Sequence, residues 1–211
     1  MPLDSFQQAV LEGFFRREGG FFLTGGAALA GFHLGHRATK DLDLFTTEDR
    51  LEDGASALID ISDELGATLE ELRTAPTFRR FLLRRGDESV IVDLVHDLAP
   101  QIFPDKLSIG QIRVDPPEEI LANKLCALLA RAEIRDIVDV LTLEKHGFSI
   151  EAAMENAAKK DGGLTPAQLA WVLSEMEIGG DARPPAGVTV DQLREFLKDL
   201  QGRLTKLAFP E

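Results

Sequence analysis

The chain has 211 residues, of which 44% are apolar and 28% charged, as expected of a globular protein with a substantial core. Its net charge of −13 argues against a protein that coats duplex DNA, because phosphate binding requires a positive surface. The sequence lacks a membrane-length apolar run and a secretory-signal pattern and holds a single cysteine, so we expect a cytoplasmic protein without a membrane partner.

The first part of the chain, residues 1–115, is predicted to be an α/β (α+β) unit. Apolar residues at helical spacing predict helices over residues 3–18, 27–34 and 51–66. Short apolar or alternating runs predict strands over residues 21–24, 41–45, 68–72 and 107–114. Residues 78–96 are typical of a hairpin that turns at Gly86 and Asp87.

From residue 116 onwards the pattern becomes entirely helical. Asp115 can cap a helix whose first turn holds Pro116 and Pro117, and we expect one helical stretch from there to about Lys145. Further helices are predicted over residues 149–160, 165–178 and 189–207. We therefore divide the chain into a core over residues 1–115 and a helical C-terminal domain or cap over residues 116–211.

Asp41 and Asp43 carry the strongest functional signal. They stand two apart on a predicted strand that alternates through Phe45, so both carboxylates point to one face while Leu42, Leu44 and Phe45 can pack toward the core. Two carboxylates this close repel each other unless a cation lies between them. Mg²⁺ or Mn²⁺ meets this need, because hard ions bind through carboxylates and substrate phosphates. The alternative is an exposed acidic strand.

Gly25 and Gly26 lie between a predicted strand and a predicted helix. Without side chains there, backbone N–H groups can approach a phosphate. A glycine pair followed about fifteen residues later by Asp41 and Asp43 favours a site where metal holds a nucleoside triphosphate. Asp93, inside the apolar run VIVDLV, is the best candidate for a third carboxylate, because a buried acid is costly without a partner. The alternative is an edge-strand acid that faces water.

Segment 23–45 resembles the core of polymerase-β-type nucleotidyltransferases, and more closely that of AbiEii-type toxins of abortive-infection and type IV toxin–antitoxin systems. The residues that carry this resemblance are Gly25-Gly26, His36-Arg37 and Asp41-Leu42-Asp43-Leu44-Phe45. It continues at Ala122, Lys124-Leu125, Ala127-Leu128, Arg131, Arg135-Asp136, Asp139 and Leu143, and so spans roughly residues 20–145. The wider superfamily usually has serine where this chain has Gly26, so a hydroxyl that contacts phosphate is missing.

The resemblance implies a nucleotidyltransferase-like mixed sheet with helices and a role for each site residue. The implied metal ligands are Asp41, Asp43 and Asp93, with Asp93 near the incoming hydroxyl. The implied nucleotide-binding residues are Gly25, Gly26, Arg37 and Lys124, and Asp136 is an active-site acid.

Three cations, Lys124, Arg131 and Arg135, are spaced by seven and four residues. On one continuous helix they would share a narrow stripe. Cations on an otherwise apolar face need an anion, which is either a nucleotide phosphate or the carboxylates of Asp136 and Asp139. An internal salt-bridge network is therefore the alternative to phosphate binding.

We therefore predict metal-dependent nucleotidyl transfer, in which an acceptor hydroxyl near Asp93 attacks the α-phosphate of a nucleoside triphosphate and pyrophosphate leaves. By resemblance the acceptor is a tRNA end or a protein, and a cognate antitoxin is a further partner. The net charge predicts a small RNA contact at a rim lined by Arg37, Lys40 and Arg79 or Arg80. Two alternatives are a small-molecule nucleotidyltransferase of the aminoglycoside-modifying kind and a catalytically silent nucleotide-binding or interaction module.

Overall fold

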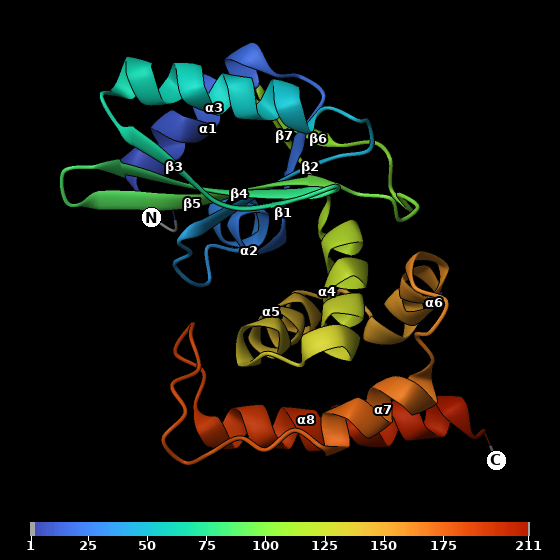
Figure 1. Ribbon diagram of the computed structural model, residues 1–211. Coiled ribbons are helices and arrows are strands. Elements are labelled where there is room, and N and C mark those ends of the chain that lie inside the picture. The colour runs from blue at the N-terminus through green and yellow to red at the C-terminus, as the bar shows by residue number, and fades with distance from the viewer. Residues whose placement is uncertain (1–2, 211) are drawn as a thin grey trace. The chain divides into compact units, whose positions relative to one another are not determined.

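The computed structural model describes residues 3–210, which divide into two compact units. Unit 1 extends to Leu98 and includes Asp105–Pro116, whereas unit 2 consists of Ala99–Pro104 and the chain from Pro117 onwards (Figure 1). Residues 99–104, which sequence reasoning grouped with the core, thus pack with the helical unit.

Unit 1 is built on a seven-stranded sheet with the order β3-β4-β5-β2-β1-β7-β6. The strands are β1 (Phe22–Thr24), β2 (Asp41–Thr46), β3 (Thr68–Ala75), β4 (Phe78–Arg85), β5 (Glu88–His96), β6 (Leu107–Ile109) and β7 (Ile112–Val114). β2 runs parallel to β5, and β1 runs parallel to β7, whereas the other neighbours are antiparallel. The predicted fold class, a mixed sheet with helices, is confirmed. The strand structure predicted over residues 107–114 is present as two strands, β6 and β7, because a turn at Gly110 (φ +62°) divides the segment.

Helices cover both sides of this sheet (Figure 1). The helical segments of unit 1 are α1 (Ser5–Arg17), α2 (Gly25–Ala28) with its π-helical continuation η1 (Leu29–His33), and α3 (Leu51–Leu65). α1 and α3 lie on one side and α2 on the other. α1 begins with a capping box, in which Asp4 and Gln7 each bond the other's backbone N–H. Under α1, the rings of Phe14 and Phe21 pack edge to face at 5.3 Å in the core.

Strand β2 alternates between the buried core and the α2 side of the sheet. Leu42, Leu44 and Thr46 are fully buried, whereas Asp41 and Asp43 are half-buried on the other side. The expectation that Phe45 would join the core is wrong, because a period of two residues places its side chain with the aspartates. Its ring lies beside that of Phe22, its partner on β1, at 6.4 Å.

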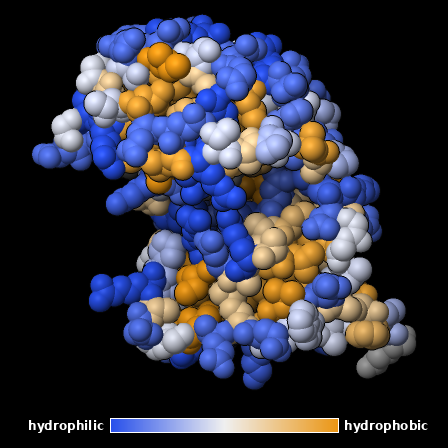
Figure 2. All heavy atoms as spheres, in the orientation of Figure 1, coloured by the Kyte–Doolittle hydropathy of each residue, from blue (hydrophilic) through white to orange (hydrophobic). Residues whose placement is uncertain are grey.

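Residues 117–210 of unit 2 form five helices. They are α4 (Pro117–Arg131), α5 (Ile134–Lys145), α6 (Ile150–Lys160), α7 (Pro166–Ser174) and α8 (Val190–Ala208). The one helix expected from residue 116 to about Lys145 is wrong, because Ala132 adopts a positive φ of 45° and ends α4. Figure 2 shows hydrophilic side chains over most of the visible surface, with apolar side chains gathered in places on both units.

Segment 99–104 is held to unit 2 by one buried carboxylate. Glu119 Oε2 accepts hydrogen bonds from the backbone N–H groups of Ile102 (3.0 Å) and Phe103 (2.7 Å), and its Oε1 accepts one from Lys160. Lys160 also donates to the carbonyl oxygen of Pro100 at 2.9 Å.

None of the helices formed by residues 3–210 combines the length and apolar character that a bilayer crossing requires.

We predict that Gly54→Ala destabilises the protein, although alanine favours helices over glycine by about 1 kcal/mol. A Cβ at Gly54, inside α3, would lie 2.8 Å from the ring of Phe21 and 3.0 Å from Leu94, both fully buried. Overpacking of this kind costs about 1–3 kcal/mol and outweighs the helix preference.

Gly202, an exposed residue inside α8, is the matched control, because a Cβ there meets nothing within 4 Å. Gly202→Ala should raise the free energy of unfolding by roughly 0.5–1 kcal/mol. Urea unfolding of the two variants measures both effects. If Gly54→Ala stabilised the protein as much as Gly202→Ala does, α3 would not pack closely enough on the sheet to exclude a methyl group at Gly54.

Candidate active site

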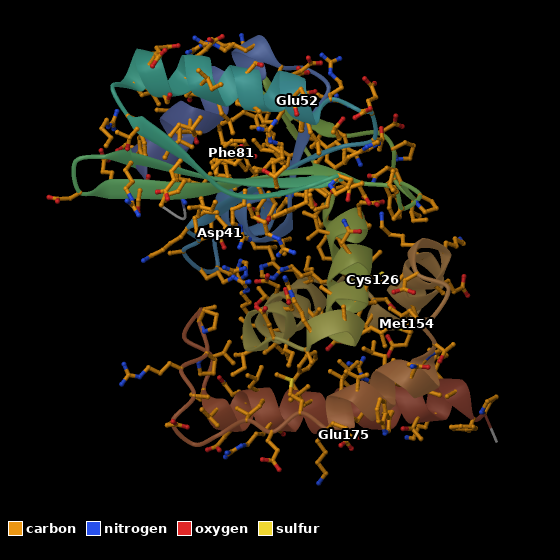
Figure 3. All side chains as sticks on the ribbon, in the orientation of Figure 1. Asp41, Glu52, Phe81, Cys126, Met154 and Glu175 are labelled. Carbon is orange, nitrogen blue, oxygen red and sulfur yellow. The ribbon has the colours of Figure 1, made fainter. Side chains whose placement is uncertain are left out.

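A row of polar side chains crosses four strands on the α2 side of the sheet. The register pairs Thr24 of β1 with Asp43 of β2, Asp43 with Asp93 of β5, and Asp93 with Arg80 of β4. Directly paired residues point to the same side, so these four side chains stand next to one another, one strand spacing of about 4.8 Å apart. Figure 3 shows Asp41 on the side of the sheet opposite to Phe81.

The backbone at Gly25 lies against the carboxylate of Asp43. A Cβ on Gly25 would be 2.3 Å from Asp43 Oδ2, and the residue has a φ of +63°. Both facts exclude a side chain there, since the conformation itself favours glycine. The turn between β1 and α2 thus brings bare backbone next to the first acidic pair, as the glycine spacing predicted.

Arg37 takes the space that a side chain at the next position would occupy. A Cβ on Gly26 would lie 2.5 Å from Arg37 Nη2. Arg37 is half-buried, and its Nη1 donates a hydrogen bond to the carbonyl oxygen of Ala38 at 3.2 Å. A guanidinium therefore lies over Gly26, the position at which the resemblance implies a serine.

Asp93 is held by Arg80. The carboxylate is only 6% exposed, and both of its oxygens accept hydrogen bonds from the guanidinium, Oδ1 from Nε and Oδ2 from Nη2, each at 2.7 Å. The hydrogen bonds to Asp93 raise the pKa of Arg80; partial burial opposes this, and the charges of Asp93, Asp41 and Asp43 raise the pKa further. The Arg80 guanidinium therefore lies in the field of all three predicted metal ligands.

Among residues 3–210, no three acidic, histidine or cysteine side chains converge as a ready-made metal site. The carboxylate of Asp93 is instead bound by Arg80. The adjacent pair Asp41 and Asp43 nevertheless suits a divalent ion, since hard cations take one or two carboxylates and fill the other positions with water or phosphate. In addition, the buried hydroxyl of Thr24 has no hydrogen-bond partner among the described residues.

Lys124 of α4 lies in a buried cluster in unit 2. Its Nζ is 2.7 Å from Asp136 Oδ1 and 2.8 Å from Asp139 Oδ2, and both carboxylates are fully buried. Arg131 donates to Asp136 from Nε at 2.8 Å and from Nη2 at 3.2 Å. The stripe of three cations on one helix is wrong, because the break at Ala132 places Arg135 on α5, where it pairs with Glu133.

These contacts set the charge of Asp136. Burial disfavours its charged form, but the charges and hydrogen bonds of Lys124 and Arg131 outweigh burial, so its pKa lies below the ordinary value of 3.8. Asp136 is therefore ionised at neutral pH. The salt-bridge alternative for Lys124 describes the ligand-free protein, and a phosphate contact of this residue stays a prediction.

Of the predicted site residues, unit 1 brings together Gly25, Gly26, Arg37, Asp41, Asp43 and Asp93, whereas Lys124 and Asp136 belong to unit 2. Sequence reasoning missed Thr24 and the role of Arg80 as the partner of Asp93. Arg79 does not line this side of the sheet, because alternation places it on the α3 side, where it pairs with Glu52 and Glu71.

A sequence model described as "Nucleotidyl transferase AbiEii toxin, Type IV TA system" matches residues 11–208. The match extends well beyond residues 20–145, where the resemblance was expected, and includes most of the C-terminal helices. No curated protein sequence matches the chain.

Solved structures share the fold. MenT4, a nucleotidyltransferase toxin from Mycobacterium tuberculosis, has a TM-score of 0.61 and 14% identity, covering 94% of this chain and 81% of that one. JHP933 from Helicobacter pylori has a TM-score of 0.56 and 19% identity, covering 95% and 91%. The antibiotic-resistance factor ANT(2″)-Ia has a TM-score of 0.50 and 20% identity, covering 74% and 91%. At these identities the likeness establishes the fold alone.

We predict that Asp136→Asn destabilises unit 2 by about 3–5 kcal/mol at neutral pH, because Lys124 and Arg131 lose a buried anion. The pKa of Asp136 is depressed in the folded protein, so its charge contributes stability above the ordinary carboxyl pKa. That contribution is lost as the pH falls through the depressed pKa. The difference in the free energy of unfolding between wild type and variant should therefore become smaller below about pH 4.

Urea unfolding from about pH 7 down to about pH 3 measures this difference. Asp191→Asn on α8 is the control, since Asp191 is 96% exposed and its pair with Arg194 should contribute less than about 1 kcal/mol at any pH. If the difference in the free energy of unfolding between wild type and Asp136→Asn stayed constant or grew in acid, the charge of Asp136 would not stabilise the cluster.

Proposed function

Since this chain belongs to the AbiEii family of nucleotidyl transferase toxins, it is a nucleotidyltransferase, and we propose that its acceptor is the end of an RNA, most simply a tRNA. We further propose that the transfer depends on a divalent metal ion and arrests growth until a cognate antitoxin opposes it. The observation that carries the proposal is the row of Thr24, Asp43, Asp93 and Arg80 beside the bare backbone of Gly25. The cytoplasm supplies both nucleoside triphosphates and tRNA, so we place the activity there.

Asp41 and Asp43 would hold Mg²⁺ or Mn²⁺. The ion, when bound, neutralises phosphate charge and favours loss of the acceptor proton. The two carboxylates share one side of β2, and Gly25 keeps the backbone close to Asp43, so a triphosphate can approach the pair. Asp93, next to Asp43, would orient the acceptor hydroxyl and accept its proton.

Three groups around the glycine turn can bind the triphosphate. Gly25 and Gly26 begin α2, and because the first N–H groups of a helix have no partner within it, they can donate to a phosphate. The buried hydroxyl of Thr24 needs a partner, because an unsatisfied buried hydroxyl costs about 1–3 kcal/mol. The guanidinium of Arg37 lies against Gly26 and suits a phosphate better than a hydroxyl does, because it presents several charged donors at once.

Lys124 and Asp136 are the two implied site residues that belong to unit 2. The Lys124 ammonium has three N–H donors, of which Asp136 and Asp139 account for two. The resemblance implies a phosphate contact for Lys124 and an active-site acid at Asp136, and we carry both over as proposals. A buried ion cluster is weak evidence for stability alone, and this favours a functional reason for keeping it.

An RNA acceptor is supported by the hairpin next to the carboxylates. Phe78 and Arg84 alternate with Arg80 onto the Asp93 side of β4, and Arg73 pairs with Arg80 across β3 and β4. The guanidinium carbon of Arg73 lies 5.6 Å from the centre of the Phe78 ring, and Arg84 is 60% exposed. Cations around an aromatic ring on a sheet face suit an unpaired base and its phosphates better than a small cationic drug.

We predict that Asp41→Asn and Asp43→Asn each lower nucleotidyl transfer by at least a hundredfold, because each removes a metal ligand. The melting temperature should hold or rise, since each change also relieves carboxylate repulsion. Purified protein, Mg²⁺, α-labelled nucleoside triphosphates, total tRNA and a cell extract provide the assay. Asp87→Asn, in the hairpin turn, is the control and should leave transfer unchanged.

The label identifies the acceptor. Label at the end of an RNA supports the proposal, whereas label on a protein or a small molecule rejects an RNA acceptor and keeps nucleotidyl transfer. An aspartate variant within about tenfold of wild type, about 1.4 kcal/mol of barrier, would reject the metal assignment.

We predict that Arg37→Ala weakens triphosphate binding by roughly tenfold, about 1.4 kcal/mol, because a charged phosphate contact is lost. Gly26→Ser should give no gain in the wild-type background, where Arg37 occupies the place of the new side chain. In the Arg37→Ala background the same change should tighten binding, because the serine hydroxyl then reaches the phosphate.

Titration of a fluorescent nucleoside triphosphate into the four proteins measures this coupling. Lys40→Ala is the control, since Lys40 is exposed beyond the turn and its removal should leave the affinity for the triphosphate nearly unchanged. Equal effects of Gly26→Ser with and without Arg37 would mean that the guanidinium and the hydroxyl do not compete for one place.

A further inference from the structure

Arg80 is hydrogen-bonded to Asp93, one of the three carboxylates of the candidate active site. Its guanidinium meets Asp93 through two parallel hydrogen bonds of 2.7 Å, the geometry of a strong charge-assisted pair. A guanidinium that binds both oxygens of a carboxylate competes with a divalent cation there, because both are positive and both need these oxygens. Asp93 is therefore already bound to a cation before any metal ion arrives.

Two features show that the pair belongs to the site and is more than a structural ion pair. Arg80 remains 40% exposed although Asp93 is buried, so the guanidinium borders the open side of the sheet. Arg80 also pairs with Asp93 across β4 and β5, and Asp93 pairs with Asp43 across β5 and β2, so the guanidinium lies on the same side of the sheet as the acidic pair. The ring of Phe78, 5.6 Å from the guanidinium carbon, lies on its other flank and limits its movement.

We propose that Arg80 is a built-in cation of the active site, a positioning residue that holds Asp93 in place of a metal ion, so that the nucleotide-free protein binds one divalent ion. That ion binds through Asp41 and Asp43. This inference rests on the metal dependence proposed above. Within this group of four residues the charges then balance, since three carboxylates face one guanidinium and one doubly charged ion.

The consequence for Asp93 is specific. While Arg80 donates to both oxygens, Asp93 keeps a fixed orientation next to Asp43 and is available to an acceptor hydroxyl rather than to metal. Removal of the guanidinium frees both oxygens beside two other carboxylates. A second divalent ion should then bind, because three unneutralised carboxylates attract a cation more strongly than two.

Manganese binding to the purified, nucleotide-free protein tests this, with free Mn²⁺ counted by electron paramagnetic resonance. We expect one bound ion in the wild type and two in Arg80→Gln, which keeps the length and polarity of the side chain without its charge. The double variant Arg80→Gln with Asp93→Asn should return to one, which locates the second ion at Asp93. Arg84→Gln, on the same side of the same strand, is the matched control and should bind one.

The number of bound ions shows which part of the proposal fails. Two ions in the wild type, or one in a folded Arg80→Gln protein, would overturn the role of Arg80 and leave metal-dependent transfer standing. No bound ion in the wild type would overturn this inference, whereas the metal dependence of transfer is decided separately by the activity of Asp41→Asn and Asp43→Asn. Should Arg80→Gln fail to fold, Arg80→Lys replaces it: a single ammonium cannot cover both oxygens, so Mn²⁺ should bind at Asp93 at least tenfold more tightly than in wild type, and unchanged binding overturns the proposal.

Discussion

The candidate site depends on the parallel register between β2 and β5. This register places Asp43 beside Asp93, and it is held from the buried side of the sheet, where Leu42 pairs with Val92 and Leu44 with Leu94. Because side chains alternate, a slip of one residue would bury the aspartates and expose the leucines. The hydrophobic packing under α1 and α3 thus enforces the geometry of the charged residues on the opposite side. An acid on β2 and an acid on β5 can act together only because the core permits a single alignment.

Much of this arrangement follows from local sequence patterns. The alternation of DLDLF places Asp41 and Asp43 on one side, and the two-residue turn at Gly86 and Asp87 sets the hairpin register. Counting back from that turn pairs Arg80 with Asp93, so this contact was within reach of the sequence. The parallel pairing of β2 with β5 was not, because strands far apart in the chain carry no turn that fixes their alignment. The break after α4 was equally hidden, since Ala132 is neither glycine nor proline.

The glycine pair shows how one substitution is compensated by a neighbour. A serine in place of Gly26 would offer a hydroxyl to a phosphate, and its absence first suggested a silent nucleotide-binding module. In the folded chain Arg37 occupies that space, and Thr24 brings a buried hydroxyl one residue before the turn. The site therefore lacks the serine and retains two donors that can perform its role. Loss of a motif residue is weak evidence for loss of function when the vacated volume holds a charged group.

The two ion clusters differ in a way that bears on their roles. The Lys124 cluster buries Asp136 and Asp139 completely, whereas Arg80 holds Asp93 from a partly exposed position. Ion pairs cost desolvation energy, and well-packed apolar residues often give equal stability, so a closed cluster such as that of Lys124 is an expensive way to hold helices together. Arg80 loses less hydration, and its charge acts where Asp41 and Asp43 repel each other. A fixed arginine in an acidic site lowers repulsion before any ligand binds. It therefore lets the sheet keep three carboxylates close together without depending on metal to fold.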